Sequence, residues 1–146
     1  MADIPEEHLT EELLDRLLAS ASIEQYLDEG LVSARTLTDY LFDRMEAHGL
    51  KRADVVRASG LNATVVYDIF SGKSRPGRDH AIMLAFGLKC TLRETQRLLR
   101  LAGVSELWCK QRRDAIIIWC MRNGFDRIAT DDELYRMGEA TLLPAD

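Results

Sequence analysis

Residues 51–76, with the sequence KRADVVRASGLNATVVYDIFSGKSRP, decide the fold that we expect for this chain. Their apolar side chains recur at helical spacing in two short runs, one around Val55 and one within residues 65–70. Gly60, between the runs, can adopt the left-handed conformation that ends a helix, and Asn62 can cap the helix that follows. The stretch therefore predicts two short helices joined by a tight turn.

The end of this stretch carries a second signal. Gly72 can stop the second helix, and Pro76 cannot continue it. A helix, a glycine-containing turn and a second helix are the layout of a helix-turn-helix. The pieces Gly60-Leu61-Asn62 and Gly72-Lys73-Ser74-Arg75-Pro76 match the Cro/CI-type (XRE-type) helix-turn-helix family position by position. The chain resembles that family, which implies a five-helix, lambda-repressor-like domain whose second motif helix enters the major groove of DNA.

The resemblance also implies which residues contact DNA. The family's base-reading positions fall on Asn62, Ala63, Thr64 and Tyr67. Phosphate contacts are expected from residues before and after the second helix: Lys51, Arg52, Lys73, Ser74, Arg75 and Arg78. The chain departs from the family at Arg52, Val56 and Phe70, where the family often has Gln, Ala and Glu.

Three segments are expected along the chain. Residues 1–36 form an acidic helical arm, in which Leu9, Leu13, Leu14, Leu17 and Leu18 repeat at helical spacing and a Ser22-x-x-Gln25 cap begins a second helix that runs to Gly30. Residues 37–103 form the helix-turn-helix domain. Residues 104–146 form a C-terminal pair of helices packed on it. The predicted fold class is all-α throughout.

The C-terminal segment contains the apolar run RDAIIIWCM at residues 113–121. We interpret it as a buried helix rather than a strand, because it ends at Asn123-Gly124 and no partner strand is visible. A shift of 35 residues places Arg78-Asp79 on Arg113-Asp114 and Gly103 on Gly138, which indicates that this helix pair repeats the preceding one. With the RDAIII piece and the arm, most of the chain resembles a bacterial group of XRE-type proteins.

The net charge of −5 is unevenly distributed. Residues 1–36 carry nine acidic side chains against two arginines, whereas residues 51–113 carry thirteen basic side chains against five acidic ones. A basic middle is compatible with phosphate binding, and an acidic arm could moderate it.

Composition and motifs favour no enzyme class. His8, His48 and His80 lie far apart, and Gly72-Lys73-Ser74 lacks the remaining glycine and the preceding strand of a phosphate-binding loop. Asp131-Asp132-Glu133 has no alternating ligand pattern, so we expect no metal and no cofactor.

Cys90, Cys109 and Cys120 are expected to be reduced and mostly buried thiols. The chain lacks an apolar run long enough to span a membrane and begins with an acidic segment, so we expect a cytoplasmic protein.

Two functions remain open at this stage. The first is a DNA-binding transcriptional regulator, which would act as a homodimer on double-stranded DNA because one short helix reads few bases. The alternative is an adaptor that binds another protein through its helix-turn-helix surface or its arm. Val65, Val66, Tyr67, Ile69 and Phe70 make the second helix unusually apolar, and an exposed Val66 or Tyr67 would favour protein binding.

Overall fold

The computed structural model describes residues 10–28 and 36–144 of the chain. These residues form nine helices and no strand, so the all-α prediction is confirmed. The chain divides into two compact units, one within residues 1–35 and the other within residues 36–146.

The first unit contains helices α1 (Thr10–Ala19) and α2 (Ile23–Asp28). The Ser22 hydroxyl accepts a hydrogen bond from the Gln25 backbone N–H at 3.1 Å, as expected for a cap at the start of α2. Within this unit the apolar stripe of α1 is not covered, and its exposed members are Leu14, Leu17 and Leu18. Leu9, the first of the repeated leucines, and Gly30, the predicted end of the second helix of the arm, lie outside the described residues.

The second unit contains the helices that follow along the chain: α3 (Leu37–Ala47), α4 (Arg52–Ser59), α5 (Ala63–Phe70), α6 (Arg78–Gly87), α7 (Leu92–Leu101), α8 (Arg112–Arg122) and α9 (Arg127–Arg136). The β-branched run 116–118 lies inside α8, so the choice of helix over strand is confirmed. Helices α8 and α9 pack against each other, α8 packs against α7, and α9 packs against α6, so the described residues 36–144 form one packed body.

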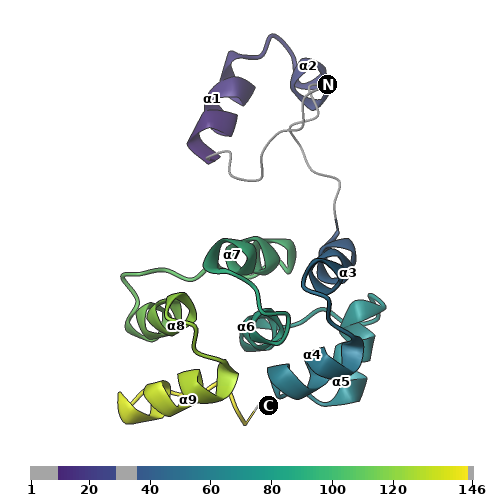
Figure 1. Cartoon of the computed structure of the whole chain (residues 1–146). Coiled ribbons are helices and arrows are strands. Elements are labelled where there is room, and N and C mark those ends of the chain that lie inside the picture. Colours follow the sequence, from purple (N-terminus) through teal and green to yellow (C-terminus); the bar gives the residue numbers. More distant parts are fainter. Residues whose placement is uncertain (1–9, 29–35, 145–146) are drawn as a thin grey trace. The chain divides into compact units, whose positions relative to one another are not determined.

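Helix α6 lies at the centre of this unit, where it packs against α4, α7 and α9 (Figure 1). Every residue from 81 to 87 is buried. Helix α4 approaches closely because residue 87 is glycine: a Cβ at this position would lie 2.8 Å from the Ser59 Cβ and 2.9 Å from the Val55 carbonyl oxygen.

Side-chain caps start several of the helices. Thr36 accepts a hydrogen bond from the Asp39 N–H at 3.2 Å, and Asp126 accepts one from the Ala129 N–H at 2.8 Å. Thr91 and Glu94 form a reciprocal capping box at the start of α7. The structure adds Gln111, which caps α8 and was not predicted, because glutamine is an uncommon capping residue.

The 35-residue repeat is visible in the bounds of the helices. Shifting α7 by 35 positions gives the bounds of α9, and shifting α6 gives those of α8 to within one residue. Gly103 and Gly138, which are related by the shift, both have left-handed backbone conformations, with φ of 77° and 76°. The helix bounds of the pair α8–α9 therefore follow those of the pair α6–α7 with a shift of 35 residues.

The repeated Arg-Asp dipeptides bind each other across α6 and α8. The Arg78 guanidinium donates to both carboxylate oxygens of Asp114, at 2.9 and 2.6 Å. The Arg113 guanidinium donates in the same way to Asp79, at 2.8 and 3.1 Å. We call these four residues the cross-paired dipeptides. They join the N-terminal ends of the two helices.

The three cysteines are free thiols, of which Cys90 and Cys120 are buried and Cys109 is exposed. Burial and the nearby negative charge of Glu94 raise the pKa of Cys90 to about 12, so this thiol stays protonated at neutral pH.

Candidate nucleic-acid interface

Local backbone chemistry positions α5. Gly60 ends α4 with φ of 81°, a conformation that a side chain would strain. Two residues later, the Asn62 Oδ1 accepts a hydrogen bond from the Val65 N–H at 2.9 Å and starts α5. The short turn sets the angle at which α5 leaves α4.

The two faces of α5 have different chemistry. Val66, Ile69 and Phe70 face the core and are almost fully buried. The opposite side, which we call the outer face, is exposed and consists of Asn62, Ala63, Thr64 and Tyr67. The apolar side chains Val66, Ile69 and Phe70 of α5 therefore belong to the core. An exposed Val66 or Tyr67 would have favoured protein binding, and of these two only Tyr67 is exposed.

The Tyr67 ring is in contact with a cationic side chain. Tyr67 is 45% exposed, and the Arg52 guanidinium carbon lies 5.1 Å from the ring centroid. This contact brings the first residue of α4 next to the outer face, so the structure joins one predicted phosphate contact to the predicted base-contacting residues.

Lys51 lies just before Arg52 and is also exposed. Its backbone N–H donates to the Asp54 carboxylate at 2.9 Å. This hydrogen bond, together with the positive charge of Arg57, lowers the pKa of Asp54 below its ordinary value. The Asp54 charge is thereby engaged with the backbone and with Arg57, and the Lys51 side chain extends from the start of α4.

The loop after α5 presents the next group of predicted residues. The backbone N–H groups of Lys73 and Ser74 both donate to the Asp68 carbonyl oxygen, at 2.9 and 3.1 Å. These bonds hold the loop while the side chains of Lys73, Ser74 and Arg75 remain exposed. Arg75 reaches the end of α7, where its Nη1 lies 3.4 Å from the position that a Cβ on Gly103 would occupy.

A polar hollow of about 350 Å³ lies beside this loop, and we call it the basic hollow. The start of α3 forms its other wall with the hydroxyls of Thr36 and Thr38, which lie 3.1 Å apart. The combination of two hydroxyls, Lys73 and Arg75 suits a phosphate group. Sequence reasoning missed the two threonines, although a helix N-terminus is a known signal for anion binding.

Arg78 has a different role from the predicted phosphate contact. Besides Asp114, its guanidinium donates to the Ser105 and Glu106 carbonyl oxygens, at 3.0 and 2.9 Å. Every nitrogen of the group thus has a partner inside the protein. We correct this prediction: Arg78 holds the fold together, and the Asp114 carboxylate cancels its charge at short range.

No cluster of histidine, cysteine or acidic residues that could hold a metal occurs within residues 10–28 and 36–144. His48 ends α3, and its Nε2 lies 3.3 Å from a Glu94 carboxylate oxygen. Across the same two ranges, none of the helices has the length and apolar character needed to cross a membrane.

No protein-family model matches this chain, and no curated protein or solved structure is significantly similar to it.

Proposed function

We propose that this chain is a DNA-binding transcriptional regulator of the Cro/CI helix-turn-helix type, acting in the cytoplasm without catalytic activity. In this proposal α4 and α5 are the two motif helices of a lambda-repressor-like domain, and the outer face of α5 enters the major groove. A homodimer would present two such helices to paired half-sites.

One observation carries the proposal: a polar outer face with cations on two sides of it. Arg52 contacts Tyr67 on that face, with Lys51 next to it, and Lys73 and Arg75 follow the far end of α5. Side chains of this kind neutralise phosphates on either side of a groove, and this gives most of the affinity for DNA.

Base reading by this face is limited. The Asn62 Oδ1 already caps α5, so its side-chain N–H₂ is the group that remains to donate to a base. A bidentate contact to adenine would require the cap to break. Ala63 offers only a methyl group, and we therefore expect affinity to depend more on phosphates than on sequence.

The main test is the double variant Lys73→Ala/Arg75→Ala, measured by fluorescence anisotropy on mixed-sequence duplex DNA over a range of salt concentrations. Loss of two phosphate contacts should reduce the salt slope of log K by about 1.8, since each contact contributes about 0.9. The matched control is Lys110→Ala/Arg122→Ala, which removes the same charge from exposed positions outside this surface. Equal slopes in the two variants would refute the proposed interface.

A second variant tests the outer face itself. Asn62→Asp keeps a good N-cap on α5 but places a carboxylate where DNA would lie. Binding should weaken at least about tenfold, the equivalent of 1.4 kcal/mol, while the melting temperature stays unchanged. Unaltered DNA affinity in a folded Asn62→Asp protein would remove α5 from the interface.

The second candidate function is a protein-binding adaptor. It is favoured by the exposed leucines of α1, because exposed apolar residues in a group are typical of contact surfaces. Binding to a protein through such residues would change little with salt, whereas binding to DNA through several phosphates weakens steeply.

A further inference from the structure

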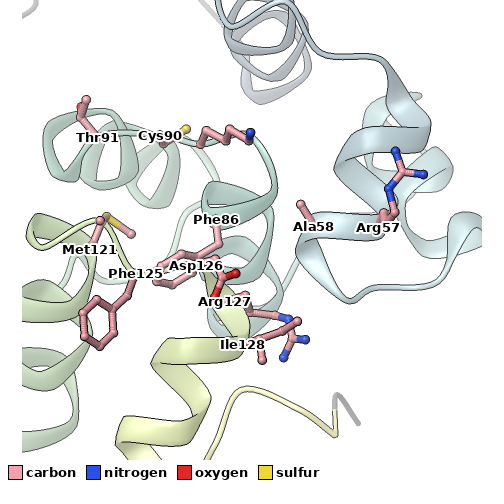
Figure 2. A pocket seen from close by; sticks show the side chains of 12 residues that line it. Arg57, Ala58, Phe86, Cys90, Thr91, Met121, Phe125, Asp126, Arg127 and Ile128 are labelled. Carbon is pink, nitrogen blue, oxygen red and sulfur yellow. The ribbon is translucent and has the colours of Figure 1, made fainter.

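A separate cleft of about 630 Å³ lies away from the outer face of α5, between the C-terminal end of α4 and the start of α9. Figure 2 shows side chains from several elements around it, including Ala58 of α4, Phe86 of α6 and Ile128 of α9. Its volume falls in the range of about 300–1,000 Å³ that is typical of sites for small organic molecules. We call it the interhelical cleft.

Part of the lining is apolar. Phe86, Met121, Phe125 and Ile128 contribute aromatic and aliphatic surface, and the exposed fraction of Ile128 is 61%. Such a surface would accept a hydrocarbon chain or a ring, because burying apolar area releases about 25 cal/mol per Å².

The remaining lining is cationic. Arg57, Lys89 and Arg127 are the cationic lining residues, of which Arg57 pairs with Asp54 and Arg127 with Asp131. Asp126 contributes one carboxylate, which is engaged in capping α9. The starts of α7 and α9 also lie at the cleft, at Thr91 and Asp126, and a helix N-terminus carries a partial positive charge. The cleft therefore favours an anion.

Lys89 has an unusual backbone conformation for its residue type. With φ of 56°, it is the one non-glycine residue in the left-handed region within the described part of the chain. The position related to it by the 35-residue repeat is Gly124, which has φ of 78° and also lines the cleft. The chain thus retains a strained lysine where its own repeat has glycine, and sparsely populated conformations of this kind are concentrated at functional sites.

The charge of Lys89 is available at the cleft. Its side chain is exposed, and within the described residues its ammonium group has no ion-pair partner. Arg127 is held differently: its Nη1 donates to Asp131 at 2.8 Å, while its buried Nε has no hydrogen-bond partner among the described residues. The free Nε of Arg127 lies against Gly60, which does not line the cleft, so Lys89 is the cation that offers the cleft an unused donor.

We propose that the interhelical cleft binds an organic anion in which a carboxylate is joined to an apolar chain or ring. Lys89 pairs with the carboxylate, and the apolar part lies on Phe86, Met121 and Phe125. The Cys90 thiol beside them stays protonated, so binding is non-covalent. The inference stands apart from DNA binding, because the cleft residues are not those of the outer face.

The test uses octanoate as the probe, followed by chemical-shift titration of the backbone amides of the full chain. Octanoate should shift the amides of residues 86–91 and 121–128. Two matched probes separate the parts of the ligand: 1-octanol lacks the charge, and acetate lacks the chain. Both should bind at least about tenfold more weakly than octanoate. Equal binding of octanol, or octanoate shifts confined to other parts of the chain, would overturn the proposal.

Lys89→Gly is the most informative variant, because it should weaken ligand binding without lowering the stability of the fold. Glycine relieves the left-handed strain, so the melting temperature should not fall. Loss of the ammonium group should weaken octanoate binding about tenfold, as expected for one charged hydrogen bond. Lys110→Gly removes a lysine outside the cleft and should leave the affinity unchanged. A folded Lys89→Gly protein with unchanged octanoate affinity would refute the assigned role of the lysine.

Discussion

Asp114→Asn tests the cross-paired dipeptides that join α6 to α8. The Asp114 side chain is 4% exposed and accepts two hydrogen bonds from Arg78. It also accepts the Trp108 N–H at 3.0 Å. Asparagine has nearly the same shape and can keep the bond to Trp108, but it removes the charge and turns an N–H₂ group toward the Arg78 donors.

The expected cost follows from the burial of the carboxylate and from the groups that remain around its partner. Removing one member of a buried ion pair typically costs about 3–5 kcal/mol, because the other charge is left uncompensated. Arg78 is 28% exposed and keeps its bonds to the Ser105 and Glu106 carbonyl oxygens. Water and these carbonyls partly compensate the charge, so we expect a loss of about 2–3 kcal/mol in the free energy of unfolding.

Urea denaturation followed by circular dichroism gives this free energy. The matched control is Asp79→Asn in the related pair, where the aspartate is 42% exposed. Solvent screening should limit that loss to about 1 kcal/mol or less. The partner Arg113 is 15% exposed, but it keeps its bonds to the Ala140 and Thr141 carbonyl oxygens. The two chemically identical substitutions therefore compare a buried carboxylate with an exposed one.

The pH dependence provides an independent measurement. Burial opposes ionisation of Asp114, but hydrogen bonds from Arg78 and Trp108 and the charges of Arg78 and Arg113 outweigh it and lower its pKa below the ordinary value. A lowered folded-state pKa adds stability above the unfolded pKa of about 4. The advantage of the native protein over Asp114→Asn should therefore be complete at neutral pH and fade as the pH falls through the lowered pKa. Equal losses for the two variants at pH 7, or a difference that does not change with acid, would refute this account.

Two other predictions concern packing and a partly buried carboxylate. Gly87→Ala should lower the free energy of unfolding by about 1–3 kcal/mol, because the new methyl group would lie 2.8 Å from the Ser59 Cβ. Gly77→Ala is the control: a Cβ at residue 77 would have no neighbour within 4 Å, so this substitution should be nearly neutral in the same urea assay. Glu94→Gln should cost about 1–2 kcal/mol at pH 7, because it removes the charge that pairs with Arg44 but keeps a residue that suits the capping box. Burial opposes ionisation of Glu94, but the Thr91 N–H and Arg44 outweigh it and lower the pKa of this carboxyl group. The cost of Glu94→Gln should therefore disappear as acid protonates the native carboxylate. A cost that stays the same between neutrality and a pH of about 3 would contradict this reasoning.

Local features of the fold were predictable because they depend on residues close together in the chain. A cap such as Asn62 bonds a backbone N–H three residues later, and a glycine such as Gly60 acts through its own φ. The 35-residue repeat was visible for a similar reason: the same local signals recur in the same order. The outer-face residues came from the family resemblance, and the exposure of Val66 and Tyr67 was left open; the structure buries Val66 and exposes Tyr67.

The interaction partners of individual charged side chains were not predictable in this way. Arg78 follows Lys73 and Arg75 closely in the chain, and the sequence grouped all three as phosphate contacts. Its actual partner, Asp114, is 36 residues away, and only the packing of α8 beside α6 brings the two together. The basic hollow depends likewise on α3 meeting the loop after α5.

The sequence by itself determined the all-α class, the caps at Ser22 and Asn62, and the turn between α4 and α5, because each depends on spacing within one or two helical turns. Only the tertiary structure decided which cations remain available and where a cleft opens. Those properties arise from groups that are distant in sequence, and a charge is neutralised or free according to what the fold places beside it. Arg78 and Lys89 show the two outcomes: the first is paired inside the fold, and the second is strained and exposed at a cleft.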